Sequence, residues 1–342
     1  MKRLKTAFLP ASAVLLATSA LAQSSLTLSG RVDLGLLHAP TDLAKGTDSS
    51  NQVAESSNGR LNLSGREDLG SGLSAFFMME ARFNADTGAI TDQAAFFKDK
   101  SWVGLASKDW GEVKMGRLHS PQYGIGTAGR YEAFIGDSYA SMGTRGARSA
   151  NQWNNSVYYT TPTVGGFHAG VIKRFGEGVS ANGVGGHLVY ADGPLSLAYS
   201  YQKEQDTTIP TIFSAIKTHT LGGFYDFGVV KFVGTYARSS GVNTAHTGSE
   251  VVWTAGARVP LGPGEFRTSY RVMDDTNRKA TGDASGDQDS RRFSVGYAWY
   301  LSKLTSINLS LVRERQKRYS ASGATTVDNA GNGAEAALRV MF

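Results

Sequence analysis

The last nine residues of the chain, 334–342, read AEAALRVMF. Apolar side chains occupy every second position, the period at which side chains return to one face of a β-strand: Ala334, Ala336, Leu338, Val340 and Phe342. The chain therefore stops inside a strand, on an aromatic residue. Because a terminal strand frays unless neighbours hold it, we predict that other strands pair with this one on both of its sides.

The opposite end has the layout of a cleaved secretory signal. MKRLKTAFLPASAVLLATSALA starts with basic residues, continues with an apolar run and ends with small residues at Ala20 and Ala22. The run is interrupted by Pro10 and followed by the polar QSS, so it is short for an anchoring transmembrane helix. We expect residues 1–22 to be removed on export, which makes Gln23 the first residue of the mature chain.

Composition narrows the classes of protein further. Loss of the signal lowers the net charge from +6 to +3, since it takes Lys2, Arg3 and Lys5. With no basic run longer than the pair Arg291 and Arg292, we expect no nucleic-acid partner. The 41 glycines, 14 tyrosines and 16 phenylalanines favour strands and turns, and there are no cysteines to form disulfides. No second run of about 20 apolar residues exists, so a membrane crossing would have to use strands.

Alternation between apolar and other residues recurs along the chain. In LSAFFMMEARF, one face carries only apolar residues: Leu73, Ala75, Phe77, Met79, Ala81 and Phe83. In RFSVGYAWYL, the apolar residues Phe293, Val295, Tyr297, Trp299 and Leu301 face away from a small and polar side. A soluble β-sandwich would show the same alternation with its apolar face turned inward, so the pattern alone leaves both architectures open.

Connection lengths favour a membrane barrel. Tight turns such as DLGSG, SKDWG, ADGP and LGPG alternate with long polar stretches at residues 38–58, 119–154, 275–289 and 316–333. About sixteen strands of roughly ten residues fit an outer-membrane barrel, beginning near residues 24, 59, 72, 97, 111, 155, 165, 184, 194, 217, 229, 250, 264, 290, 304 and 334. We predict a closed antiparallel transmembrane β-barrel, residues 23–342, in which the strand ending at Phe342 pairs with the strand beginning near Ser24.

Several stretches carry a family resemblance. They are QSSLTLSGRVDLGL, GRLNLSGREDLGSGLSAFFMME, VGLASKDWGEVKMGRL, NNSVYYTTPTVGGFHAG and the terminal Phe342. As a set they resemble the general porins of beta-proteobacteria, the neisserial and Comamonas-type group. The resemblance implies a homotrimer of sixteen-stranded barrels in the outer membrane of a Gram-negative bacterium, among outer-membrane lipid and lipopolysaccharide, with short periplasmic turns and long extracellular loops. It also implies that the outer-membrane assembly machinery reads the strand ending at Phe342.

The resemblance further implies that the third loop folds into the pore. This loop would span residues 119–153, the longest connection in the chain, and long loops in compact domains are usually functional or disordered. The family commonly has an arginine shortly before NNSV, where this chain has Gln152. Arg145 or Arg148 could take its place, and the sequence leaves that choice open. Asp99, between Lys98 and Lys100, would weaken a positive field at a position where the family often has basic residues.

Alternation predicts that the lumen receives more bases than acids. The expected basic side of the constriction is Arg31, Arg60, Arg82, Lys98, Lys100, Lys114 and Arg148, and the expected acidic side is Glu80, Glu132 and Asp137. Arg66, Arg267, Arg271 and Arg292 are also expected to line the lumen, against Asp33, Glu112 and Glu265. Charged rings select ions by shifting local concentrations, an effect screened over about 8 Å in physiological salt. We expect passive diffusion of small hydrophilic solutes and ions, with a mild preference for anions.

Other functions find less support in the sequence. GIGTAG matches a dinucleotide-binding pattern at Gly124, Gly126 and Gly129, but no βαβ unit surrounds it. The six histidines lack the spacing of metal ligands, and neither a metal nor another cofactor is expected. No nucleophile signature indicates an enzyme. A membrane-bound hydrolase and an adhesion protein remain as alternatives, and the second is consistent with polar loops such as DDTNRKATGDASGDQDS.

Overall fold

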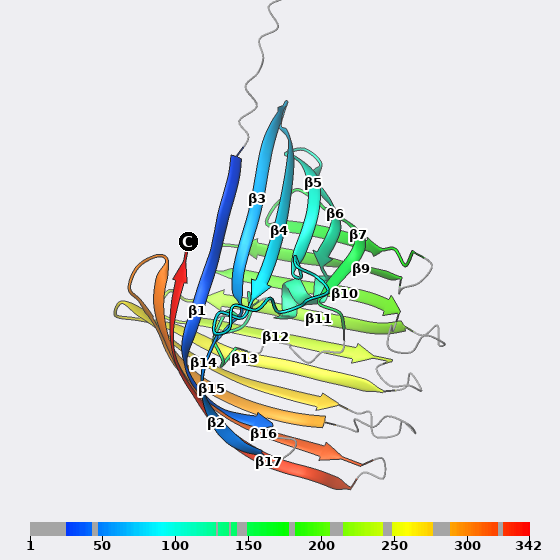
Figure 1. The fold of residues 1–342 in the computed structure, drawn as a ribbon. Coiled ribbons are helices and arrows are strands. Elements are labelled where there is room, and N and C mark those ends of the chain that lie inside the picture. The colour runs from blue at the N-terminus through cyan, green and yellow to red at the C-terminus, as the bar shows by residue number, and fades with distance from the viewer. Residues whose placement is uncertain are drawn as a thin grey trace, which may run out of the picture.

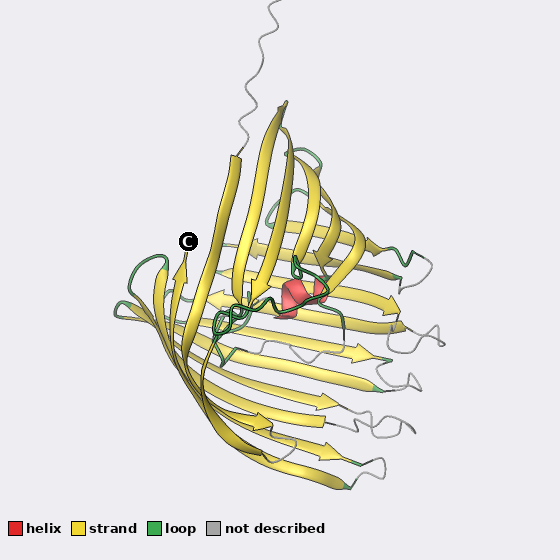
Figure 2. Cartoon of the chain, in the orientation of Figure 1, coloured by secondary structure: helices red, strands yellow, loops and turns green. Residues whose placement is uncertain are grey.

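The computed structural model describes residues 25–42, 47–127, 129–136, 138–141, 149–177, 182–205, 215–241, 248–275, 288–320 and 324–342. The predicted signal, residues 1–22, lies outside these ranges. Most of the described chain forms antiparallel strands that curve around a central space (Figures 1 and 2). A short π-helical turn, η1 (Tyr123–Thr127), lies inside the curved sheet. Among the described residues, no helix is long and apolar enough to cross a membrane.

The strands follow one another along the chain with short or long connections between them. They are β1 (Ser25–Asp42), β2 (Thr47–Ala54), β3 (Gly59–Gly70), β4 (Leu73–Phe83), β5 (Lys100–Ser107), β6 (Gly111–His119), β7 (Gln152–Thr160), β8 (Phe167–Arg174), β9 (Gly183–Asp192), β10 (Leu195–Gln205), β11 (Ala215–Asp226), β12 (Lys231–Ser240), β13 (Ser249–Leu261), β14 (Gly264–Asp275), β15 (Gln288–Tyr300), β16 (Thr305–Tyr319) and β17 (Thr325–Met341).

These seventeen segments fill sixteen positions around the barrel. β2 and β3 both pair with β1, β2 along residues 35–42 and β3 along residues 25–31. They are therefore two segments of one position, separated by residues 55–58. From β3 onward each strand pairs with the next, and β17 returns to β1. The structure confirms the predicted sixteen-stranded closed barrel.

The C-terminal strand is held on both sides, as its pattern predicts. β17 pairs with β16 on one side and with residues 31–38 of β1 on the other. The backbones of Gly30 and Phe342 exchange two hydrogen bonds, with N···O distances of 2.9 and 3.1 Å. Because the ends of the chain meet in this way, the sheet has no free edge at the seam.

The apolar face of the sheet points outward. Leu26, Leu36 and Leu311 expose 72%, 69% and 60% of their surface, whereas inward-facing Asp33 and Arg267 are buried. A soluble sandwich would bury the leucines instead. The outward apolar band requires a lipid environment, so the structure decides between the two architectures in favour of the transmembrane barrel.

Strand positions agree with the sequence predictions except at two places. Fifteen of the predicted starts lie within three residues of the observed ones, but β17 begins at Thr325 and not near residue 334. β2 was expected to be part of a loop, which is wrong. In both places the hydrogen-bonded ladder continues through polar sequence, for example where Lys317 lies opposite Asp328. Beyond the lipid both faces of a strand meet water, so the apolar alternation disappears while the backbone pairing persists.

A buried ion pair marks the seam, and its loss should weaken the barrel. Asp33 lies directly opposite Arg339 and accepts a hydrogen bond from Arg339 Nε at 2.9 Å. Removing Arg339 leaves the charge of Asp33 buried without its counter-ion. We therefore expect Arg339→Met to lower the free energy of unfolding by about 3 kcal/mol. The control Arg315→Met breaks an exposed pair with Asp328 and should cost less than about 1 kcal/mol. Urea unfolding in detergent measures both, and equal losses would contradict a special role for the seam pair.

Candidate pore constriction

The described residues of the connection between β6 and β7 pack against the lumen side of the barrel and are called the inner loop here (residues 120–127, 129–136, 138–141 and 149–151). Three of its side chains lie against glycines on inward-facing positions of the wall. A Cβ atom added to Gly222 would lie 2.4 Å from the Tyr131 ring, and one added to Gly256 would lie 2.9 Å from Ala133. Gly296 receives Phe134 in the same way, at 2.8 Å. These wall positions therefore have room for the loop only because they carry no side chain.

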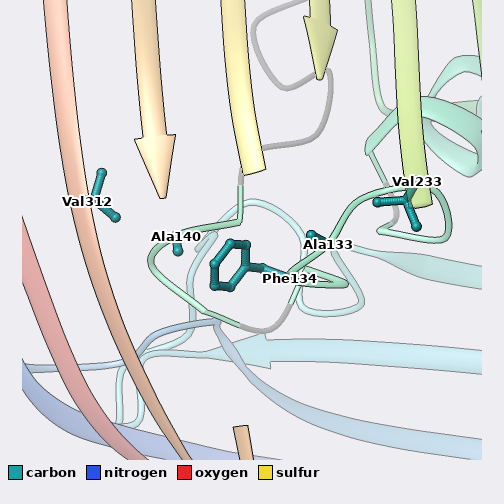
Figure 3. Packing of buried hydrophobic residues seen from close by; sticks show 5 residues of the cluster. All are labelled: Ala133, Phe134, Ala140, Val233 and Val312. Atoms are coloured by element: carbon teal, nitrogen blue, oxygen red, sulfur yellow. The ribbon is translucent and has the colours of Figure 1, made fainter. Parts of the chain in front are cut away.

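Buried apolar contacts hold the same part of the loop. Figure 3 shows Phe134 with Ala133 and Ala140 of the inner loop between Val233 and Val312. Val233 belongs to β12 and Val312 to β16, both on the inward face, where most neighbours are polar. Burying Phe134, which is 2% exposed, stabilises the folded loop by roughly 2 kcal/mol.

Carboxylates on the wall anchor the inner loop at two further points. Glu335 on β17 accepts hydrogen bonds from Ser138 Oγ at 2.6 Å and from the backbone nitrogen of Tyr139 at 3.1 Å. Glu204 on β10 accepts one from the backbone of Ala150 at 2.6 Å, and a second from Nε1 of Trp153, at the start of β7, at 2.8 Å. The loop is thus fixed to widely separated strands, which sets how far it enters the lumen.

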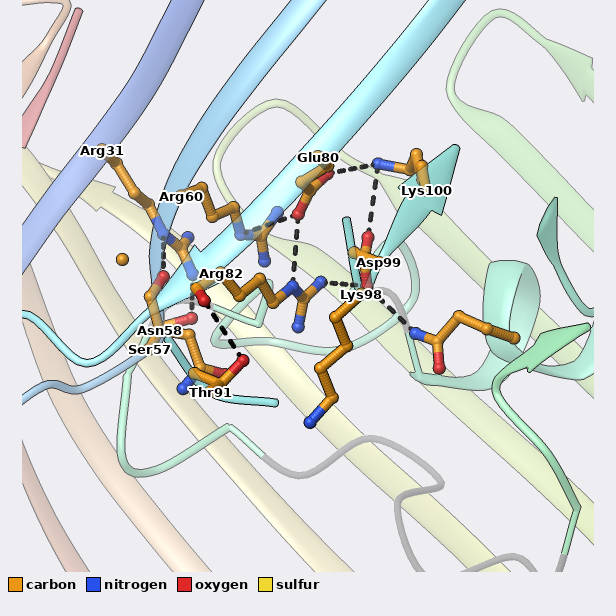
Figure 4. A network of polar contacts seen from close by, with 12 residues as sticks. Arg31, Ser57, Asn58, Arg60, Glu80, Arg82, Thr91, Lys98, Asp99 and Lys100 are labelled. Carbon is orange, nitrogen blue, oxygen red and sulfur yellow. Dashed lines mark hydrogen bonds and ion pairs between the residues drawn. The ribbon is translucent and has the colours of Figure 1, made fainter. Parts of the chain in front are cut away.

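Opposite the loop, basic side chains gather around Glu80 on β4 (Figure 4). Lys100 Nζ lies 2.7 Å from one carboxylate oxygen of Glu80. The other oxygen lies 3.2 Å from Arg82 Nε and 3.6 Å from Arg60 Nε. The structure therefore brings Arg60, Arg82, Lys100 and Glu80 together, from three adjacent strands, in one ion-pair network.

Asp99, just before β5, extends the network. Its carboxylate lies 2.5 Å from Arg82 Nη2 and 2.8 Å from His119 Nε2, and it accepts a hydrogen bond from Gln152 Nε2 at 3.0 Å. Burial alone would raise the pKa of Asp99, but the hydrogen bond with His119 and the charges of Arg82 and Lys100 hold that pKa well below its usual range. Gln152 stands where the resemblance leads us to expect an arginine. Its side-chain amide donates a hydrogen bond to Asp99.

Arg31 on β1 connects the wall to the inner loop. Its guanidinium donates to Ser57 Oγ and to the backbone oxygen of Asn58, the latter at 3.3 Å. Ser57 Oγ in turn donates to the backbone oxygen of Gly136 at 3.0 Å. Residues 55–58, the break between β2 and β3, therefore bridge the basic wall and the loop (Figure 4).

A cavity of about 380 Å³ lies between wall and loop and is called the eyelet here. Four arginines line it, Arg31, Arg60, Arg82 and Arg292, together with inner-loop residues such as Tyr123, Ser138 and Tyr139. The one carboxylate among its lining residues is Glu55, which accepts hydrogen bonds from Asn58, Gly59 and Ala85. Within the described part of the chain, the lining of this cavity therefore carries more positive than negative charge, and the ion pairs of Arg82 with Asp99 and of Arg292 with Glu314 offset part of the excess.

Other predicted constriction residues lie elsewhere. The side chain of Lys98 points away from the network in Figure 4 and lies 3.8 Å from Asp92. Lys114 pairs with Glu112 at 2.5 Å, nearer the turn end of β6. Glu132 is buried inside the loop, where it accepts hydrogen bonds from Ser141 Oγ and the Phe134 backbone, and burial raises its pKa. Asp137, Arg145 and Arg148 lie outside the described residues.

Sequence reasoning placed Arg292 in the lumen but not at the constriction. This residue is on β15, five strand positions from β4 through the seam, and reaches the eyelet beside Tyr139, with its guanidinium 4.6 Å from the tyrosine ring. Only the path of the inner loop creates this meeting, and no local pattern encodes that path. The sequence does contain one indication of that path. Glycines 222, 256 and 296 fall on inward-facing positions, and the absence of side chains there marks where the loop can pack against the wall.

The strongly depressed pKa of Asp99 leads to a pH prediction. A carboxyl whose folded pKa is lowered keeps its charge as the pH falls from 7 to 4 and loses it only below that range. Asp99→Asn removes this negative charge and should raise the anion-to-cation permeability ratio by about twofold at both pH values. Reversal potentials at the two pH values test this. A difference between variant and wild type that vanishes at pH 4 would contradict it.

Taken together, the outward apolar band, the closed sheet and the loop-narrowed, arginine-lined lumen define a membrane-spanning β-barrel channel. The Gram-negative porin family matches residues 10–319. Outer membrane porin protein 32 of Delftia acidovorans is 31% identical, with 89% of each chain covered. An outer membrane porin protein of Bordetella pertussis is 28% identical, covering 85% of this chain and 89% of its own. The chain belongs to the Gram-negative porin family and forms a pore in the outer membrane.

Among solved structures, the anion-selective porin from Comamonas acidovorans superposes with a TM-score of 0.75. It is 26% identical in sequence, and the match covers 94% of this chain and all of that one. OmpT of Vibrio cholerae matches with a TM-score of 0.68 at 12% identity, covering 93% of this chain and 98% of its own, which supports the fold alone.

Proposed function

We propose that this porin is a diffusion channel for small hydrophilic solutes that mildly prefers anions. The observation that carries the proposal is the eyelet, where the described residues place four arginines and one carboxylate around the cavity. The similar Comamonas porin is described as anion-selective, which supports the same preference here. The acids Glu80 and Asp99 lie within the basic wall and offset part of its charge, so the preference stays moderate.

The eyelet arginines act through the local ion concentration. A positive surface attracts anions and repels cations over about 8 Å in physiological salt. Because the inner loop brings the opposite side of the pore close to Arg60 and Arg82, a passing ion stays within that distance. The fixed contacts of the arginines with Glu80, Asp99 and Ser57 hold these charges in place before an ion arrives.

Reconstitution into a planar bilayer under a KCl gradient tests the proposal. We expect stepwise conductance and a reversal potential of the sign that chloride permeation gives. A reversal potential of the opposite sign would refute the anion preference, and sealed membranes would refute the channel. The proposal includes no catalytic step, so purified protein should leave lipid and peptide substrates intact.

The proposal extends to assembly and processing. We propose a homotrimer embedded in outer-membrane lipid and lipopolysaccharide, from which the signal at residues 1–22 has been removed. The half-exposed ring of Phe342, on the outer face at the seam, is available to the outer-membrane assembly machinery. Sedimentation in detergent, intact mass, and the assembly yield of a variant lacking Phe342 test these three points separately.

A further inference from the structure

Aromatic side chains line the lumen on the turn side of the eyelet, and nothing in the eyelet's function uses them. Phe76, Trp102, Tyr158 and His187 face inward on β4, β5, β7 and β9, and are called the aromatic panel here. Phe76 lies four residues from Glu80 along β4, about 13 Å closer to the turns. A solute that has crossed the eyelet therefore meets this surface next.

Two cations flank the panel and contact its ring faces. The guanidinium of Arg66 lies 4.9 Å from the centre of the Phe76 ring, and Lys114 Nζ lies 5.3 Å from that of Trp102. The two rings meet edge to face with centres 5.2 Å apart. Each ring thus has both an aromatic and a cationic neighbour, an arrangement that stabilises the cation beside the ring.

The second half of the panel is equally well ordered. The hydroxyl of Tyr158 lies 2.5 Å from Nδ1 of His187, and the rings are 5.7 Å apart. Both rings lie over Gly170, where an added Cβ would come within 2.9 Å of Tyr158 and 2.5 Å of His187. Phe76 lies over Gly104 in the same way, at 3.1 Å. Because Gly104 and Gly170 have no side chains, the rings can lie directly against the backbone of the wall.

Packing behind the rings fixes their positions, while their front stays partly exposed. Trp102 and Tyr158 contact the buried cluster of Leu118, Trp153 and Ile172. All four panel residues remain half-buried, so part of each ring is exposed. A pre-ordered aromatic surface costs little entropy when a flat solute binds to it.

We propose that the aromatic panel binds planar aromatic monocarboxylates as they pass through the pore. The ring of the solute packs against Phe76 and Trp102, face to face with one ring and edge to face with the other, and its carboxylate lies near Arg66 or Lys114. Glu112, 2.5 Å from Lys114, offsets one of the two cations, which favours solutes with a single negative charge. The inference rests on the proposed function, since the solute must first pass an eyelet that admits anions.

Benzoate and cyclohexanecarboxylate are suitable probes because they share charge and approximate size but differ in aromaticity. In planar bilayers, we expect benzoate to block the wild-type current with a dwell time about fivefold longer than that of cyclohexanecarboxylate. Trp102→Leu and Phe76→Leu should each reduce this ratio toward one. Phe232→Leu, an aromatic residue on the outward face, is the matched control and should keep the wild-type ratio.

The outcomes separate this inference from the proposed function. Equal dwell times for the two probes in wild type, or an unchanged ratio in both panel variants, would overturn the binding site. The chloride reversal potential of the same membranes reports the anion preference independently. A channel that prefers chloride but does not distinguish the probes refutes the panel alone, whereas membranes without conductance refute both.

Discussion

Arg60→Glu is expected to remove the anion preference and to shift the channel toward cations. Among Arg60, Arg82 and Lys100, the arginines and lysine paired with Glu80 and Asp99, Arg60 makes the longest ion pair, 3.6 Å to Glu80, and its side chain is 30% exposed. The charge of Arg60 is thus accessible to passing ions, and Glu80 neutralises it only weakly. Reversing it changes the local charge by two units, which at about 4 Å in water corresponds to roughly 2 kcal/mol. We expect the anion-to-cation permeability ratio to fall by at least about tenfold.

Arg315→Glu provides the matched control. It makes the same change of charge, but Arg315 lies on the outward face of β16, where its side chain is 56% exposed beside Asp328. A reversal potential measured under a salt gradient should stay close to that of wild type. If both variants shift it equally, net charge and not the eyelet sets selectivity, and Arg60 has no special role.

The fold was largely predictable from sequence because lipid imposes a simple rule. Within the membrane, outward positions such as Leu197 and Leu309 must be apolar, and inward positions meet water or the inner loop. That rule produces the alternation that placed most strands within three residues. The rule does not apply where strands extend beyond the membrane. For this reason β2 and the first part of β17 were not predicted. Backbone pairing there needs no particular side chain.

The constriction was predictable only in part. Arg60, Arg82, Lys100 and Glu80 lie on neighbouring strands, so alternation and strand order together place them near one another. Arg292 and Tyr139 meet through the fold of the inner loop, which depends on contacts between residues far apart in sequence. The position of Glu132 could not be predicted for the same reason. The side chain of an acidic loop residue can either point into the pore or accept hydrogen bonds within the loop. Here it binds Ser141 and the Phe134 backbone.

Gly222→Leu should displace the inner loop and widen the pore. An added Cβ at this inward position would lie 2.4 Å from the Tyr131 ring, and the rest of a leucine side chain would occupy the space of that ring. Tyr131 is fully buried and its hydroxyl lies 3.0 Å from Ser196 Oγ, so it cannot shift without losing its place on the wall. The barrel itself should survive, since its ladder does not depend on the loop. We expect conductance to rise roughly twofold as the narrowest section opens, and anion preference to decline.

The neighbouring Gly223 supplies the control, because the next residue along a strand points to the other face. A Cβ at Gly223 would lie 3.0 Å from the end of the Leu197 side chain, which can rotate away. Gly223→Leu should therefore leave conductance and selectivity unchanged while altering the same strand to the same extent. Single-channel recordings of both variants decide the matter. If Gly222→Leu conducts like wild type, contact between Tyr131 and the bare wall does not hold the loop in the lumen, and the contacts of Phe134, Glu335 and Glu204 must anchor it instead.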